Sequence, residues 1–276
     1  MKGTKSFNET LNDAFNDLSL HGFDSAARVE FWAQKIREAA RGAMASPDQM
    51  DKWVRAGLGA VYKRLVDNGE LLRMNKGVSR YTLEKVKPKL RGELDRRMAM
   101  SRSLIKLNRD KVIEEEVQRW TGWASSIPAG GSSQIDKKEE KDKLKASLAS
   151  LPFKERRVLI DQGHKMTASL NEIVAVGGGA LAGIWHSQWR RPDYDYREDH
   201  KERDKQLFVV RGNWAMEKGL MKLDGHKYTD EITKPGEEIF CSCNYSWIYN
   251  LSSLPESMLT AKGKEELARV RKEIAR

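Results

Sequence analysis

The chain has 276 residues, a formal net charge of +10 at pH 7, a charged fraction of 33% and two cysteines. One pair of cysteines does not resemble the disulfide framework of a small secreted domain, so we expect a reducing compartment. No apolar run approaches the roughly 20 residues of a membrane-spanning helix, and the start MKGTKSFNE lacks the apolar stretch of a signal peptide. We therefore expect no membrane association and a protein made in the cytoplasm, whose basic surface attracts polyanions such as nucleic acid.

Apolar residues at helical spacing predict that the first half of the chain is a series of helices. A first helix follows the capping box that starts at Ser6, a second follows Ser25, and a third begins at Pro47. After a short β-like piece over residues 79–83, a long charged helix is predicted from about Pro88 onward. We interpret most of its basic residues as solvated, because acidic residues interrupt them.

A change of composition in the middle of the chain predicts its domain organisation. The stretch SSIPAGGSSQ, residues 125–134, is rich in proline, glycine and serine and indicates a loop or linker. We therefore divide the chain into a helical region at 1–125, a polar linker with a charged helix at 126–150, and a mixed domain with a basic terminal helix at 151–276. The predicted fold class is α+β, with a mostly helical N-terminal half.

The second half has a different pattern. A helix is predicted from Glu155 to Val174, and the glycines at 177–179 then form a turn before an apolar segment that contains tryptophan. These glycines are not a nucleotide-binding loop, because they lack the lysine and the serine or threonine of a phosphate loop. Strands are predicted in LFVVRG from residue 207 and in NYSWIYNL from residue 244.

The two cysteines, Cys241 and Cys243, lie two residues apart on a segment that we predict to be extended. Alternate residues of a strand project to the same face, so both thiols are available to one site. Together with His200 they are candidate zinc ligands, and a fourth ligand could come from His186 or Asp199. The alternative is that both cysteines are buried as small hydrophobic residues.

The sequence offers little for catalysis, and we predict that the protein is not an enzyme. It contains no serine nucleophile motif, no His-Glu-x-x-His motif and no phosphate loop. Acidic and basic residues crowd the loop over 193–204, which could hold a divalent ion or a general base. Solvated charges that pair with one another explain this loop equally well, and nothing in the sequence indicates a thiol with a lowered pKa.

Four stretches of the second half follow one another in a recognisable order. They are WHSQW from residue 185, YDYREDHKERDKQLF from 194, RGNWAMEKGL from 211 and YTDEITKPGEEIFCSC from 228. This order resembles the phage Mu F-like head-morphogenesis proteins, which are minor capsid proteins of tailed bacteriophages. In that family an Arg-x-x-His element precedes a β-run, and a Pro-Gly element leads to a Cys-x-Cys pair. The matching residues here are Arg197, His200, Pro235, Gly236, Cys241 and Cys243.

Two positions depart from the pattern of the family. Ser242 stands between the cysteines where arginine is common, which removes a basic contact at that point. Lys205 stands where a glycine turn often follows the histidine element. Lysine at this position predicts a less extreme backbone angle than glycine would adopt.

The resemblance implies a structural minor head protein that associates with the portal vertex or the inner capsid during head assembly and DNA packaging. The implied partners are the portal protein and capsid or scaffold proteins, with double-stranded DNA contacted non-specifically. The implied location is the virion, after assembly in the host cytoplasm. The recurring Cys-x-Cys and histidine elements also favour a zinc ion that holds the small domain in shape. Candidate DNA contacts are Arg190, Arg191, Lys201 and Arg203.

Two other interpretations stay open. A DNA-binding internal or ejection protein would leave the capsid with the genome and would bind DNA on its own in a salt-sensitive manner. A metal-dependent hydrolase would use Asp199, His200 and the cysteines around an open coordination position. Such an enzyme would lose activity without losing its fold when His200 is replaced by alanine.

Overall fold

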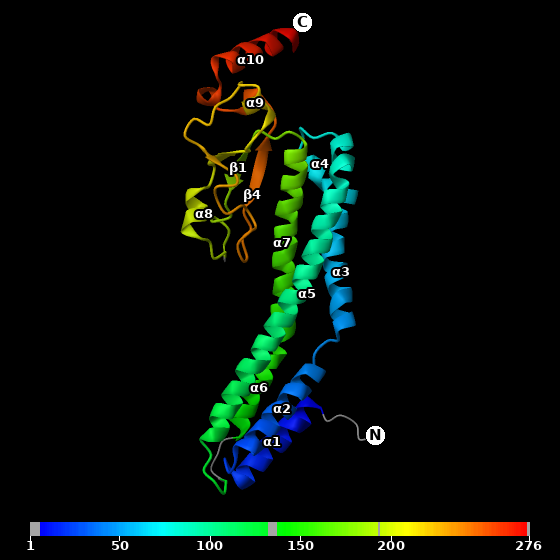
Figure 1. The fold of residues 1–276 in the computed structure, drawn as a ribbon, viewed down its shortest axis with the longest axis vertical. Helices are drawn as coiled ribbons and strands as arrows, with labels where there is room; N and C mark the ends of the chain where they lie inside the picture. Colours follow the sequence, from blue (N-terminus) through cyan, green and yellow to red (C-terminus); the bar gives the residue numbers. More distant parts are fainter. Residues whose placement is uncertain (1–5, 132–136, 193, 275–276) are drawn as a thin grey trace. The chain divides into compact units, whose positions relative to one another are not determined.

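The computed structural model describes residues 6–131, 137–192 and 194–274 (Figure 1). Helices make up 66% of it, and the described residues also form a small mixed sheet of four strands in the second half. The predicted α+β class with a helical N-terminal half is therefore confirmed.

The chain forms two compact units, and each is made of two segments. Unit 1 comprises Met1–Arg55 and Met100–Val158, and unit 2 comprises Ala56–Ala99 and Leu159–Arg276. This partition differs from the predicted domains, which are consecutive stretches divided around residues 126–150. The reason is that three long helices contribute residues to both units, which linker composition cannot anticipate: α3 (Pro47–Tyr62), α5 (Arg80–Ser125) and α7 (Leu151–Gly177).

Unit 1 is built from helices and the turns that connect them. It contains α1 (Phe7–His21), α2 (Ala26–Gly42) and α6 (Lys137–Ala149), together with parts of the three long helices. The predicted starts of the first two helices are confirmed, because Ser6 and Ser25 each accept a hydrogen bond from a backbone N–H of the first turn.

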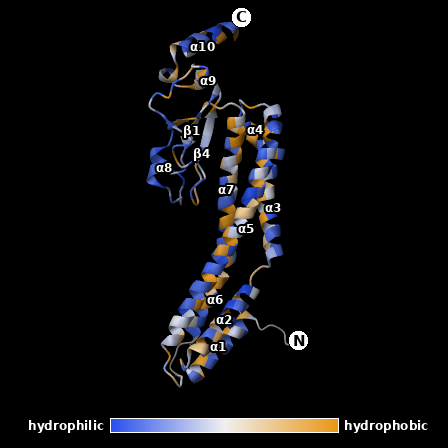
Figure 2. Cartoon of the chain, in the orientation of Figure 1, coloured by the Kyte–Doolittle hydropathy of each residue, from blue (hydrophilic) through white to orange (hydrophobic). Residues whose placement is uncertain are grey.

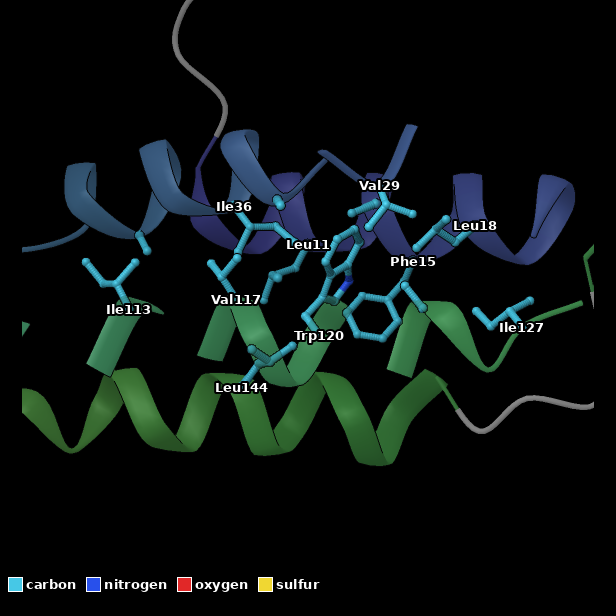
Figure 3. Close-up of a cluster of buried hydrophobic side chains, with 14 residues drawn as sticks. Leu11, Phe15, Leu18, Val29, Ile36, Ile113, Val117, Trp120, Ile127 and Leu144 are labelled. Carbon is cyan, nitrogen blue, oxygen red and sulfur yellow. The ribbon is translucent and has the colours of Figure 1, made fainter. Parts of the chain in front are cut away.

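The core of unit 1 is a cluster of apolar side chains around Trp120. Each main contributing helix presents buried residues three or four positions apart, which places them on one face. Trp120 is 1% exposed and reaches from α5 towards α1 and α2, beside Phe15 (Figure 3). This Trp120 cluster consists of Leu11, Ala14, Phe15, Leu18, Val29, Ala33, Ile36, Ala40, Ile113, Val117, Trp120, Ala124, Ile127 and Leu144.

The first part of the predicted linker packs against the end of α1. Phe23 N–H donates to the Ile127 carbonyl at 3.2 Å, and Gly130 N–H donates to the His21 carbonyl at 3.0 Å. Ile127 itself is buried in the Trp120 cluster. This part of the linker is therefore a packed turn, whereas residues 132–136 lie outside the described residues.

Helix α5 begins earlier than predicted. The expectation of a β-like piece at 79–83 and a helix start near Pro88 is wrong, because residues 80–83 form the first turn of α5. Ser79 caps this turn, since its Oγ accepts a hydrogen bond from Thr82 N–H at 3.1 Å. Pro88 lies inside the helix, where it lacks the N–H that would donate to the preceding turn.

Unit 2 combines the other parts of the long helices with short helices and the sheet. The strands lie in the order β3-β2-β1-β4, with β1 antiparallel to β2 and β4, and β2 parallel to β3. The strands are β1 (Ala182–His186), β2 (Leu207–Val209), β3 (Lys227–Tyr228) and β4 (Asn244–Ile248). The helices are α4 (Glu70–Met74), α8 (Glu198–Glu202), α9 (Trp214–Glu217) and α10 (Ala261–Ile274), with a π-helical turn at Lys63–Asp67 and 3-10 turns at Leu251–Ser253 and Glu256–Met258.

Hydrogen bonds, one of them between two buried side chains, join α7 to the segments around β4. Asn75 Nδ2 donates to Asn171 Oδ1 at 2.7 Å, and the Tyr249 hydroxyl donates to Asn75 Oδ1 at 2.6 Å. Lys234, in the loop before β4, pairs with Glu172 of α7 at 2.6 Å. Leaving a buried polar group without a partner costs about 1–3 kcal/mol of folding free energy. These bonds therefore stabilise one packing arrangement of the sheet against α7.

Hydrophilic and hydrophobic residues alternate along the helices (Figure 2). This pattern is typical of helices with one buried and one solvated face. Within the described part of the chain, none of the helices combines the length and the apolar character that a membrane crossing requires.

Candidate metal centre

Three side chains from distant parts of the sequence meet in unit 2. His200 lies on α8, and Cys241 and Cys243 lie in the loop that leads into β4. His200 Nδ1 is 3.6 Å from Cys241 Sγ and 3.5 Å from Cys243 Sγ. All three side chains are buried. Because thiolate sulfur and imidazole nitrogen are metal ligands, this Cys–His cluster could hold a metal ion.

The other ring nitrogen of His200 faces a carboxylate that the sequence did not suggest. Glu238 Oε2 lies 3.7 Å from His200 Nε2. The same carboxylate pairs with the guanidinium of Arg197, which also donates to the Ile239 carbonyl at 3.0 Å. Arg197 and His200 lie one helical turn apart, so both residues of the Arg-x-x-His element reach Glu238. No sequence signal marks Glu238, because its role depends on a loop that returns from far along the chain.

The two thiols have different electrostatic environments. The hydrogen bond with Cys243 and a second bond from Gly236 N–H, at 3.3 Å, lower the pKa of Cys241 to about 5. The hydrogen bond with Cys241 and burial raise the pKa of Cys243. No pattern in the sequence indicated this lowered pKa, because it depends on groups that the fold brings together. Cys241 is the thiol of the pair that ionises first, as a metal ligand must.

Backbone hydrogen bonds hold the Cys-x-Cys segment from both sides. Ser242 N–H donates to the Tyr194 hydroxyl at 3.0 Å, and that hydroxyl donates to the Phe240 carbonyl at 3.2 Å. Phe240 has a φ of 59°, and its N–H donates to Asp161 of α7 at 2.6 Å. These contacts fix the loop between α7 and the chain around Tyr194, and they aim both thiols at His200.

An aromatic wall closes the cluster on its inner side. Trp185 of β1 is fully buried and meets the His200 ring edge-on, with ring centroids 5.3 Å apart. Phe208 and Tyr245 pack around Trp185 in the same group of buried residues as the cysteines. Apolar walls around a polar centre keep water away and strengthen its electrostatic interactions.

The predicted fourth ligands lie outside this group. His186 is at the end of β1, paired with Asn244 of β4. Asp199 falls into a separate group with His200 and Glu238, and its carboxylate pairs with Arg203 at 2.7 Å. Among the described residues, the structure therefore brings together the histidine and the two cysteines, without His186 or Asp199 as a further ligand.

The turn after α8 shows that one expectation about the backbone is wrong. Lys205 has a φ of 67°, which is the left-handed region that glycine usually occupies. Its N–H donates to the Trp185 carbonyl at 2.8 Å, which holds the turn against β1. The position therefore keeps the conformation of a glycine turn although a lysine occupies it.

A cavity of about 270 Å³ adjoins the Cys–His cluster. Both cysteines contribute to its wall, together with His164 and Glu172 of α7 and Tyr245 of β4. The Tyr245 hydroxyl is buried and has no hydrogen-bond partner among the described residues. The cavity thus brings polar side chains close to the candidate metal ligands.

The predicted DNA contacts lie near α8, and three of them face acidic partners. Arg190 pairs with Asp204 at 3.1 Å and stacks on Trp189, with its guanidinium carbon 4.2 Å from the ring centroid. Lys201 pairs with Glu198 at 2.6 Å, and Arg203 with Asp199 at 2.7 Å. Arg191 is exposed.

No family model matches the chain, and neither the curated proteins nor the solved structures contain a match. The geometry of the site and the sequence motifs therefore carry the functional argument.

Proposed function

We propose that the chain is a structural minor head protein of a tailed bacteriophage, which associates with the portal vertex or the inner capsid during head assembly. It would act by binding and placement rather than by turnover. The observation that supports this proposal is the meeting of the two halves of the Mu F-like motif. Arg197 and His200 face Glu238, while His200 also faces both cysteines 41 and 43 residues away.

We also propose Zn²⁺ as the ion of the Cys–His cluster. Zinc favours thiolate and imidazole ligands. His200 Nδ1 would be the ligand atom because it faces both sulfur atoms, and Nε2 would then face Glu238 Oε2, which lies 3.7 Å away. A carboxylate in that position fixes the tautomer and the orientation of a ligating histidine. The ion would tie α8 to the loop before β4 and so stabilise the small domain.

The test of the assembly role is co-purification with the portal protein of the same phage, in high salt and with nuclease present. Stoichiometric binding under these conditions supports the proposal, because salt and nuclease remove DNA as a bridge. Failure to bind the portal or the capsid, combined with tight and salt-sensitive DNA binding by the chain alone, would replace it with the interpretation as an internal or ejection protein.

The zinc proposal has a separate test in the metal content of the purified chain. We expect about one equivalent of zinc in the native chain and less than about a tenth in the double variant Cys241→Ser/Cys243→Ser. Ser242→Ala is the matched control, because it changes the residue between the cysteines and leaves both sulfur atoms. A native chain that takes up no zinc from a metal buffer would refute the zinc site without touching the assembly role.

One observation favours a metal-dependent hydrolase as a second candidate function. Zinc with three protein ligands keeps an open coordination position, and both cysteines line the cavity beside the cluster. Zinc-dependent hydrolysis of an ester or a phosphodiester would support this function if His200→Ala abolished it and left the circular dichroism unchanged. A structural ion predicts the opposite result, with local unfolding and no activity to lose.

A further inference from the structure

The positive charge of the chain is concentrated in one short segment. Residues 73–97 contain nine basic and three acidic residues, a net charge of +6 out of the +10 of the whole chain. The loop that carries the predicted DNA contacts is different, because residues 190–205 contain six basic and six acidic residues. The electrostatic attraction for a polyanion is therefore much stronger at 73–97 than around α8.

The acidic residues of this segment are already paired with cations of the same segment. Glu84 pairs with Lys87 at 3.1 Å, and Asp95 pairs with Arg91 at 3.7 Å. Glu93 pairs at 2.7 Å with Arg96 and with Arg97. Five cations remain without an acidic partner among the described residues, and all five are exposed: Arg73, Lys76, Arg80, Lys85 and Lys89.

These five residues, which we call the basic face, follow α4 and the first turns of α5 in unit 2. On α5, Lys85 and Lys89 lie one turn apart on one side of the buried row formed by Leu83, Val86, Leu90 and Leu94, and Arg80 lies on the other side of that row. From Arg80 to Lys89 the helix advances about 14 Å at 1.5 Å per residue. Several phosphates of a DNA strand lie within that length.

We propose that the basic face binds the phosphate backbone of double-stranded DNA without sequence preference. Lysine suits this contact, because its ammonium group is a point charge that does not read bases. Proteins that bind single-stranded DNA stack successive bases on several aromatic side chains. Among these cations, Tyr81 is a large exposed aromatic residue, and one such residue does not form a series of stacking sites. Protein interfaces place apolar residues at their centre and are depleted in lysine, so a face of unpaired lysine and arginine fits a duplex better than an acidic protein.

This proposal concerns a surface that is separate from the Cys–His cluster, and it does not depend on the assembly role. Its test compares two double variants that each remove two positive charges. Lys85→Gln/Lys89→Gln changes the basic face, and Arg190→Gln/Arg191→Gln changes the loop near α8. Both leave the same net charge, so a difference between them reports position and not total charge. The probe is a 30-base-pair duplex of arbitrary sequence, with affinity measured from low to moderate salt.

For the native chain we expect the logarithm of the affinity to fall with the logarithm of the salt concentration, with a slope of about −3 to −5. Lys85→Gln/Lys89→Gln should weaken binding at least about tenfold at 0.1 M salt and make the slope shallower by about 2. Arg190→Gln/Arg191→Gln should leave the slope unchanged. The variant Lys85→Arg/Lys89→Arg keeps the charge and should restore binding.

Three outcomes would overturn the proposal. The first is that the native chain does not bind the duplex at low salt. The second is that the two charge-removing variants weaken binding equally, which would indicate an effect of net charge alone. The third is displacement of the duplex by polyglutamate at an equal concentration of charges, which would identify an acidic protein as the ligand of this face. Circular dichroism should be unchanged in all variants. The unfolding midpoint should be unchanged in the Lys85 and Lys89 variants, because those side chains are exposed, and slightly lower in Arg190→Gln/Arg191→Gln, which loses the ion pair with Asp204.

Discussion

In unit 1, the buried side chains around Trp120 come from the faces of regular helices, and their positions repeat every three or four residues. In unit 2, the Cys–His cluster is assembled from a one-turn helix and a loop. His200 on the helix lies 41 and 43 residues before the two cysteines in the loop. The first region depends on apolar burial, which many interchangeable side chains can provide. The second depends on a few polar atoms at set distances, so it tolerates fewer substitutions.

The largest effect should come from removing the centre of the helical core. Trp120→Ala should lower the free energy of unfolding by about 3–5 kcal/mol, because it leaves a cavity where the buried ring was. Denaturant unfolding measures the change. Trp53→Ala is the matched control, since Trp53 is 51% exposed in the same unit and should change stability by less than about 0.5 kcal/mol.

This pair of variants also tests whether the two regions differ in kind. Trp120→Ala should leave the metal content of the folded chain unchanged, because no candidate ligand belongs to the Trp120 cluster. Equal destabilisation by the two tryptophan substitutions would contradict the burial argument.

A smaller effect is expected from the carboxylate behind the histidine. Glu238→Gln should lower the affinity for zinc by about tenfold, because a neutral amide holds the imidazole less strongly than a carboxylate. Competition with a chelator measures the affinity. Glu202→Gln is the control, because Glu202 is exposed on the same helix α8. An unchanged affinity in Glu238→Gln would show that Glu238 does not support His200 as a metal ligand.

The smallest effect concerns the turn after α8. Asp204 accepts hydrogen bonds from Ser187 N–H at 2.9 Å, from Trp189 Nε1 at 3.3 Å and from Arg190 at 3.1 Å. These bonds, led by the one from Ser187, hold the pKa of Asp204 below its ordinary value of 3.8. Asp204→Asn should therefore cost about 1 kcal/mol of unfolding free energy at pH 7.

The pH dependence of this difference has a definite sign. Because the folded pKa is lowered, the stabilisation by Asp204 is complete above the ordinary value of 3.8 and is lost as the pH falls through the folded pKa. Unfolding of metal-free protein at pH 7, 4 and 3 should show the gap between native chain and Asp204→Asn closing towards acid. Asp195 is exposed, so Asp195→Asn should have the same unfolding free energy as the native chain at every pH. A loss of stability equal to that of Asp204→Asn would indicate a general effect of charge.

The helical part of the fold could be predicted from local signals. Ser6 and Ser25 cap the helices that they were expected to start, since capping is decided within one turn of the chain. Local composition misplaces the start of α5, because the β-branched and aromatic residues around Tyr81 resemble a strand, while burial on a helical face outweighs this weak preference. The two-segment units could not be predicted, because they depend on contacts between distant parts of the chain.

The candidate site was predictable in its chemistry and not in its surroundings. Residue type and motif order named His200, Cys241 and Cys243, and the structure brings these three together. Glu238 was missed because an isolated glutamate carries no local signal of its position. His186 and Asp199 were expected from donor chemistry alone, which says nothing about where the chain places a side chain.

Gly236 has a consequence for how this chain can vary. Its φ is 81°, and a Cβ at this position would lie 2.9 Å from Ala168 Cβ of α7, so backbone angle and space both call for glycine. The same residue gives its N–H to Cys241 Sγ. Position 168 is therefore constrained together with position 236, because a larger side chain there would crowd the residue whose N–H donates to Cys241. A larger side chain at position 168 would therefore raise the pKa of Cys241, which lies more than 70 residues further along the chain.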